Sequence, residues 1–274
     1  MGMFEETRNM RNNPIGIFDS GVGGLTVMRS VIDRLPRESI IYYGDTARGP
    51  YGSKDLTLVR KYAMDIAAFL EDLGVKMIVI ACNSATAAGL GYVKNACEVP
   101  VIGVIEPGAL EAVRRTRNQR VGVIGTKATI ESGAYTRRIG SLSRKIEITS
   151  RDCPLLVEFV ERGEVEGAHI EQVLEEYLEP MRVAGVDTLI LGCTHYPLLH
   201  KPIARVIGDG VTIISSADAT AAEVERVLAE EGLARDTDEP RTYRFLCSGD
   251  TELARRLGRM FLGPEVEHVE KASL

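Results

Sequence analysis

Two cysteines in this 274-residue chain occupy the same place, next to the last residue, in two closely similar phrases of ten residues. The phrases GVKMIVIACN and GVDTLILGCT contain Cys82 and Cys193, and each thiol is followed by a hydrogen-bonding residue, Asn83 or Thr194. A free cysteine thiol has a pKa of about 8.5, and neighbouring groups can bring that pKa into the range of an acid or base near neutral pH. Two equivalent thiols facing one substrate could therefore exchange protons with it.

Other roles for these cysteines stay open at this stage. A buried cysteine at the end of a strand is often only a small apolar side chain. The spacing Cys193-x-His195 could belong to a metal site, but structural zinc needs four closely spaced ligands, and we expect no metal because the rest are absent. A disulfide between the two thiols is conceivable, although a reducing compartment disfavours it. The matched positions favour chemistry for Cys82 and Cys193, whereas three cysteines without polar neighbours are interpreted as structural: Cys97, Cys153 and Cys247.

Short apolar segments alternate with helical patterns along nearly the whole chain, which predicts an α/β fold with mostly parallel sheets. Apolar residues at spacings of three and four predict an amphipathic helix over Lys54 to Leu73. Each cysteine would follow a strand, where parallel sheets place their functional side chains. The expected strands are Ile15 to Phe18, Ile40 to Tyr43, Met77 to Ala81, Val101 to Val104, Val121 to Ile124, Ile146 to Thr149, Thr188 to Leu191, Val211 to Ile214, Tyr243 to Cys247 and Val266 to Val269.

An internal repeat extends beyond the cysteine phrases. The segment IGIFDS at Ile15 to Ser20 is similar in character to VGVIGT at Val121 to Thr126, although any two parallel strands can look alike. The repeat predicts two pseudo-symmetric α/β domains with the active site in the cleft between them. We expect residues 1–105 with 215–274 to form a discontinuous first domain, and residues 106–214 to form the second.

Two loops could add polar groups to such a site. The turn from Asp19 to Thr26 is rich in glycine and opens a helix, so its backbone N–H groups suit a carboxylate or a phosphate. It lacks the spacing of dinucleotide-binding turns and the P-loop lysine, which disfavours dinucleotide and ATP binding. The loop Gly44 to Gly52 is too polar for a core. Its Arg48 is left out of the site, because a loop arginine is more often solvated.

Composition and charge narrow the function classes. Hydrophobic residues make up 45% of the chain, which supports a real core, and 33 basic against 39 acidic residues give a net charge of −6 without a block of one sign. Nucleic acid and membrane are therefore not expected as partners. The polar segment Met1 to Asn13 lacks the apolar run of a secretory signal, and the five cysteines are odd in number and widely spaced. We expect a cytoplasmic protein with free thiols.

Five phrases taken together resemble the signature set of the glutamate racemase family, within the aspartate/glutamate racemases. They are GIFDSGVGGLTV, YYGDTARGPYGS, VIACNSATA, VGVIGT and LILGCTHYPLL, and they follow in order over nearly the whole chain. The resemblance implies a cofactor-independent isomerase that interconverts L- and D-glutamate and supplies D-glutamate for peptidoglycan. It also implies that Cys82 and Cys193 lie on opposite faces of the substrate α-carbon, one acting as base and the other as acid.

The resemblance further implies which residues serve the reaction. Asp19 and His195 would assist Cys82 and Cys193 as catalytic auxiliaries. Many relatives have threonine at position 84, where this chain has serine, and the hydroxyl is retained. The implied substrate-binding residues are Asp19, Ser20, Pro50, Tyr51, Gly52, Asn83, Ser84, Thr126, Thr194 and His195.

Two other possibilities stay open. A related racemase for aspartate or a hydantoin would use the same two cysteines. A protein with this fold could instead act mainly through a partner such as DNA gyrase, although retention of both cysteines favours an enzyme. No lysine motif indicates a pyridoxal Schiff base, and no cofactor is expected. A homodimer is expected.

Overall fold

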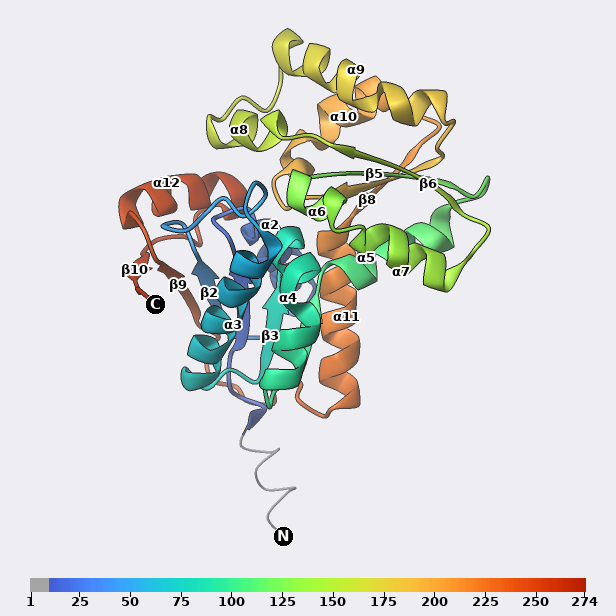
Figure 1. Ribbon diagram of the computed structural model, residues 1–274. Helices are drawn as coiled ribbons and strands as arrows, with labels where there is room; N and C mark the ends of the chain where they lie inside the picture. Colours follow the sequence, from blue (N-terminus) through green and yellow to red (C-terminus); the bar gives the residue numbers. More distant parts are fainter. Residues whose placement is uncertain (1–9) are drawn as a thin grey trace.

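The computed structural model describes residues 10–274 and contains two parallel sheets, one above the other in Figure 1. The first nine residues, which belong to the expected first domain, lie outside the described residues. The larger sheet has the strand order β10-β9-β2-β1-β3-β4, and every neighbouring pair is parallel. Its strands are β1 (Ile15–Asp19), β2 (Ile40–Gly44), β3 (Met77–Ile80), β4 (Val101–Gly103), β9 (Tyr243–Cys247) and β10 (Glu270–Lys271).

The smaller sheet repeats the central topology of the larger one. Its order is β6-β5-β7-β8, again all parallel, which matches β2-β1-β3-β4 strand for strand. Cys82 and Cys193 consequently follow equivalent strands, β3 and β7. The predicted α/β fold with two related parallel sheets is confirmed. The strands are β5 (Arg120–Gly125), β6 (Glu147–Asp152), β7 (Thr188–Gly192) and β8 (Thr212–Ser215).

Helices cover both faces of each sheet, because alternate residues of a strand point to opposite faces. In β1, Ile15 and Ile17 belong to the apolar cluster under α2, whereas Phe18 belongs to the cluster under α3 and α4. Around the larger sheet lie α2 (Leu25–Arg34), α3 (Leu56–Asp72), α4 (Asn83–Ala96), α11 (Ser216–Glu230) and α12 (Thr251–Leu262). Around the smaller sheet lie α5 (Ile105–Arg115), α6 (Lys127–Glu131), α7 (Ala134–Leu142), α8 (Leu155–Glu161), α9 (Ala168–Val183), the 3₁₀ turn η1 (Tyr196–Leu199) and α10 (His200–Ile207).

The helix expected over Lys54 to Leu73 is present as α3. It begins at Leu56 because the Asp55 carboxylate accepts hydrogen bonds from the backbone N–H groups of Thr57 and Leu58, at 2.8 and 3.3 Å. A side chain that accepts from these first free N–H groups is a preferred helix N-cap. The amphipathic pattern thus identified the helix, and the cap determines where it starts.

One expected strand is wrong. Val266 to Val269 is irregular, and the short strand β10 lies just beyond it, at Glu270–Lys271. Val266 and Val269 are buried because they pack into the cluster under α2 and α12. The spacing of three between these two valines reflects that packing and not hydrogen-bonded pairing with a neighbouring strand.

The chain passes between the two sheets twice, after β4 into α5 and after β8 into α11. The segment after α11 returns to the larger sheet as β9 and β10. These two crossovers support the proposed domain division at residues 105 and 215, which stays a proposal.

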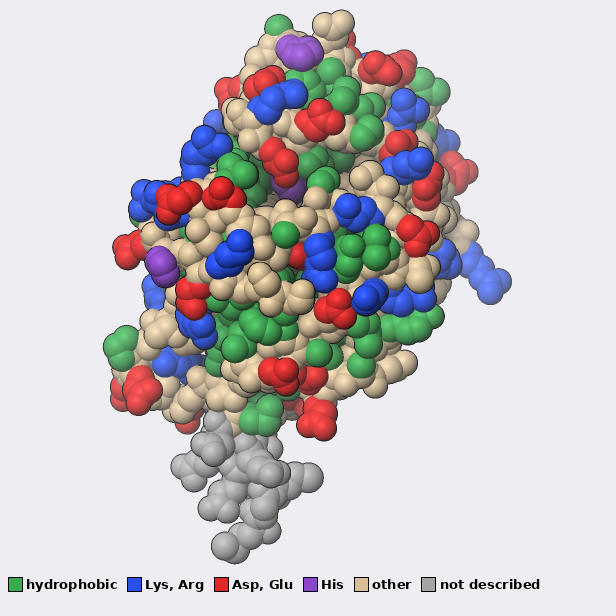
Figure 2. Space-filling model, turned by 60° about the vertical axis from the view of Figure 1, so that its left-hand side comes forward, with side chains coloured by type: hydrophobic (Ala, Val, Ile, Leu, Met, Phe, Trp, Pro, Cys, Tyr) green, Lys and Arg blue, Asp and Glu red, His purple; other side chains and the backbone are tan. Residues whose placement is uncertain are grey.

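No helix within residues 10–274 is long and apolar enough to span a membrane. Figure 2 shows acidic and basic side chains interspersed over one face of the molecule, in keeping with the small net charge of −6.

Candidate active site

A cavity of about 250 Å³ opens where the carboxyl ends of both sheets meet. Eleven of the twelve residues predicted for the site line its wall, and only Asp19 lies behind that wall. Residues from the loops after β1, β2, β3, β5 and β7 therefore converge on one space, as expected for parallel sheets. The predicted residues in the wall are Ser20, Pro50, Tyr51, Gly52, Cys82, Asn83, Ser84, Thr126, Cys193, Thr194 and His195.

Cys82 is the N-cap of α4, and its Sγ accepts a hydrogen bond from the backbone N–H of Ala85 at 3.5 Å. Its thiol also lies 3.7 Å from the Oγ of Ser20. Burial and the nearby Asp19 carboxylate raise the pKa of the Cys82 thiol, while the Ala85 N–H opposes that rise. The resting side chain is therefore a thiol, and the helix N-terminus is placed to stabilise its thiolate when one forms.

Cys193 has an imidazole as its neighbour instead of a helix end. Its Sγ lies 3.8 Å from Nδ1 of His195, and Nε2 of the same ring lies 3.3 Å from a carboxylate oxygen of Glu161. Burial opposes the imidazolium, but the Cys193 sulfur and the Glu161 carboxylate outweigh it and raise the pKa of His195 to about 10. His195 thus carries a proton at neutral pH, directly beside the second thiol.

Asp19 ends β1 and has no exposed surface. Its Oδ2 accepts from the backbone N–H groups of Gly21 and Gly24, at 3.2 and 3.1 Å, while Oδ1 has no partner within residues 10–274. Burial raises the pKa of Asp19, although the positive charge of His195 and these N–H groups oppose the rise. A buried carboxylate of this kind can take up a proton more readily than an exposed one.

Several hydrogen bonds join the two sheets around the cavity. The Oγ of Ser84 and the Oγ1 of Thr126 lie 2.9 Å apart, and the N–H of Ala128 donates to the carbonyl of Gly52 at 2.9 Å. The hydroxyl of Thr26 donates to the carbonyl of Thr194 at 3.1 Å. Both halves of the repeat thus contribute to the wall and are tied to each other beside it.

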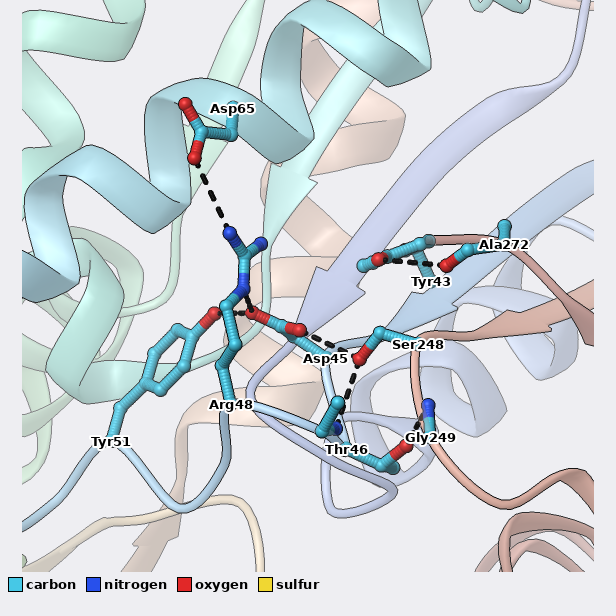
Figure 3. Close-up of polar contacts among 10 residues, drawn as sticks. Tyr43, Asp45, Thr46, Arg48, Tyr51, Asp65, Ser248, Gly249 and Ala272 are labelled. Atoms are coloured by element: carbon cyan, nitrogen blue, oxygen red, sulfur yellow. Dashed lines mark hydrogen bonds and ion pairs between the residues drawn. The ribbon is translucent and has the colours of Figure 1, made fainter. Parts of the chain in front are cut away.

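A buried carboxylate, Asp45, organises the loop that supplies Pro50, Tyr51 and Gly52. Figure 3 shows Arg48 and Ser248 directed at it from opposite sides, at 2.6 and 2.7 Å, and the hydroxyl of Tyr51 also donates to it. Arg48 reaches on to Asp65 at 3.3 Å and lies outside the cavity wall. Its guanidinium pairs with these two carboxylates and does not line the cavity.

The sequence did not predict seven further residues of the cavity wall. Three of them, Asp152, Glu158 and Glu161, form an acidic side of the cavity around β6 and α8. Glu161 is the most consequential, because it touches His195, yet it sits in an ordinary amphipathic helix with no motif to mark it. The others are Ser53, Lys127, Pro154 and Val157. No cluster of His, Cys, Asp and Glu within residues 10–274 could hold a metal ion.

Comparison with known proteins agrees with this geometry. The family of Asp/Glu/hydantoin racemases matches residues 15–224. The chain belongs to this family. It is 51% identical to a glutamate racemase of Parafrankia sp. over 264 residues, which is 96% of this chain and 95% of that protein.

Solved structures of this family share the fold. A glutamate racemase from Francisella tularensis in complex with D-glutamate superposes with a TM-score of 0.91 and 40% identity, covering 96% of this chain and 98% of that one. An isoform from Bacillus anthracis gives a TM-score of 0.90 and 38% identity, with the same coverage. The expected family and the expected enzyme class, an amino-acid racemase among the isomerases, are confirmed.

Proposed function

We propose that this racemase interconverts L- and D-glutamate without a cofactor, using Cys82 and Cys193 as the two proton-transfer groups. The observation that carries the proposal is that both thiols, at equivalent places of a repeated topology, line one cavity. Inversion at carbon requires removal of a proton from one face and delivery to the other. Reversibility requires the two groups to exchange roles.

In one direction a thiolate takes the α-proton, and the C–H electron pair stays on the α-carbon. The opposite thiol then delivers its proton to that carbon from the other face and becomes the thiolate. One proton enters and one leaves, so the enzyme finishes with its thiol and thiolate exchanged. For a further turnover in the same direction, the new thiol loses a proton and the new thiolate gains one, through neighbouring acid–base groups and solvent.

The auxiliaries suit this exchange in different ways. Asp19 can accept the proton of Cys82, since burial raises the pKa of its carboxyl group. On the other side the protonated His195 stands 3.8 Å from the Cys193 sulfur, so the proton can move between Nδ1 and Sγ. Each thiol thus has a neighbouring group that can hold its proton while it acts as the thiolate base and the other thiol acts as the acid.

The α-proton of an amino acid is very weakly acidic, so stabilisation of the carbanion-like state is the main catalytic demand. The N-terminus of α4 and the imidazolium of His195 place fixed positive charge beside the two thiols. Both lie in a largely buried site, where such charges act more strongly than in water. The same groups can offset negative charge at the α-carboxylate.

Glutamate is proposed as the substrate because relatives of this chain at about half identity are glutamate racemases and because one solved relative at 40% identity holds D-glutamate. Amide, hydroxyl and backbone donors on the wall suit its carboxylates. We further propose that the product supplies D-glutamate for peptidoglycan, and that the protein works in the cytoplasm as a homodimer.

The decisive experiment is α-proton exchange in deuterated water, with each enantiomer of glutamate and with Cys82→Ser and Cys193→Ser. Both variants should lose racemisation, and each should at most retain exchange with one enantiomer. Full racemisation by either single variant would contradict the two-thiol mechanism. Robust turnover of aspartate with none of glutamate would instead contradict the proposed substrate.

A further inference from the structure

The side-chain amide of Asn83 has a hydrogen-bond partner for its oxygen but none for its nitrogen among residues 10–274. Asn83 is 3% exposed, follows Cys82 at the start of α4 and lines the cavity. Its Nδ2 is buried and has no hydrogen-bond partner within residues 10–274. Buried N–H donors are normally paired, so this one is placed for a group that enters the cavity.

The other half of the amide is held from the opposite sheet. Tyr135 in α7 is 3% exposed, and its hydroxyl donates to Oδ1 of Asn83 at 2.8 Å. The ring is closely confined, since a Cβ on Gly192 would lie 3.2 Å from its Cε2 and a Cβ on Gly108 would lie 3.4 Å from its hydroxyl. The phenol therefore has little freedom to leave the amide.

We propose that Tyr135 is a positioning residue, which turns the Asn83 amide so that Nδ2 donates to a carboxylate oxygen of the substrate. This inference rests on the proposed function. The opposite orientation of the amide would present its oxygen to that carboxylate, and two acceptors repel each other. Because burial raises the pKa of Tyr135, the phenol keeps the proton that it donates to the amide oxygen in this arrangement.

The contact also links substrate binding to the arrangement of the two sheets. Asn83 belongs to the half that carries β3, and Tyr135 belongs to the half that carries β5 and β7. The donor is aligned only when the halves meet as they do here. Movement of one half relative to the other would release the amide and weaken the hold on substrate.

The test is Tyr135→Phe, which keeps the ring and removes only the hydroxyl. The contact with substrate exists before and during the reaction, so its loss should raise KM for both enantiomers about tenfold, with kcat within about twofold. Tyr43→Phe is the matched control, because Tyr43 is fully buried, donates to the carbonyl of Ala272 at 3.1 Å and does not line the cavity. It should lose comparable stability and keep its KM.

A double-variant cycle separates positioning from a general structural role. If Tyr135 acts through Asn83, the rise in KM caused by Tyr135→Phe should disappear in an Asn83→Ala background. Rises that multiply in the double variant, or a KM within twofold of wild type for Tyr135→Phe alone, would overturn the inference. A wild-type protein that neither binds nor racemises glutamate, measured first by calorimetry and turnover, would overturn the proposed function and the inference with it.

Discussion

Gly23 provides the sharpest test of how the backbone holds the imidazole. A Cβ at this position would lie 2.5 Å from Nδ1 of His195 and 2.5 Å from Oγ1 of Thr194. Non-bonded heavy atoms prefer about 3.5 Å, so Gly23→Ala must displace the ring by roughly 1 Å. The sulfur contact of His195, already 3.8 Å long, would then be lost.

The expected cost follows from that displacement. A misplacement of about 1 Å in a catalytic group can cost about 100-fold in rate, or about 2.7 kcal/mol of transition-state stabilisation. The added methyl should also reduce the free energy of unfolding by about 1–3 kcal/mol, as overpacking generally does. The variant should therefore be folded at 25 °C and nearly inactive.

Gly21→Ala is the matched control from the same turn. A Cβ there would meet no atom of the described residues, 10–274, within 4 Å, and neither Gly21 nor Gly23 has a left-handed φ. Racemisation can be followed by the circular dichroism of glutamate, and α-proton exchange can be measured with each enantiomer separately. Gly21→Ala should be close to wild type, whereas Gly23→Ala should lose more exchange with the enantiomer that Cys193 deprotonates. Equal activity in the two variants would refute the reasoning.

Two further predictions concern stability. The pKa of His195 in the folded protein, about 10, lies above its ordinary value of 6.5. The free energy that its protonation contributes to folding is therefore complete below pH 6.5 and is lost as pH rises toward 10. Between pH 6.5 and 8.5 the difference in unfolding free energy between wild type and His195→Asn should fall by up to about 1.4 kcal/mol per pH unit. The same pH dependence of unfolding free energy in both proteins, measured by denaturant, would disprove this. Lys76, fully buried and 2.5 Å from the buried Glu38, lies at the opposite end of β3 from the cavity. Lys76→Met should cost about 3–5 kcal/mol in denaturant unfolding without changing kcat, and adding Glu38→Gln should restore part of that loss; no recovery would argue against an ion-pair origin.

Local patterns were enough to predict most of the fold. Alternation of apolar runs with helical spacing indicated the parallel strands, and the repeated phrase indicated that β3 and β7 occupy equivalent places. Pro50, Tyr51 and Gly52 lie in the middle of the loop between β2 and α3, but the other eight predicted residues of the wall lie at the end of a strand or the start of a helix. Positions of this kind are determined by topology, which a sequence pattern reports well.

Contacts between distant segments could not be read in the same way. Glu161 touches His195 through the packing of α8 against η1, and Ser248 reaches Asp45 only because β9 returns beside β2. Nothing near these residues in the sequence distinguishes them from solvated polar side chains. Arg48, which the sequence analysis leaves out of the site, is not among the lining residues of the cavity, but it is paired with Asp45 and is not merely solvated. Long-range pairing of this kind depends on the three-dimensional arrangement alone.

The doubled topology does not make the two thiols chemically equal. Cys82 faces a helix N-terminus and a buried carboxylate, whereas Cys193 faces an imidazolium that is itself supported by Glu161. Removing a proton from Cys82 places negative charge near Asp19, but a thiolate at Cys193 lies beside a positive ring. The two sulfurs therefore have unequal surroundings, and α-proton exchange with the two enantiomers should proceed at different rates. The symmetry of the fold supplies two opposed acid–base groups, and their unequal neighbours should make the two half-reactions unequal in rate.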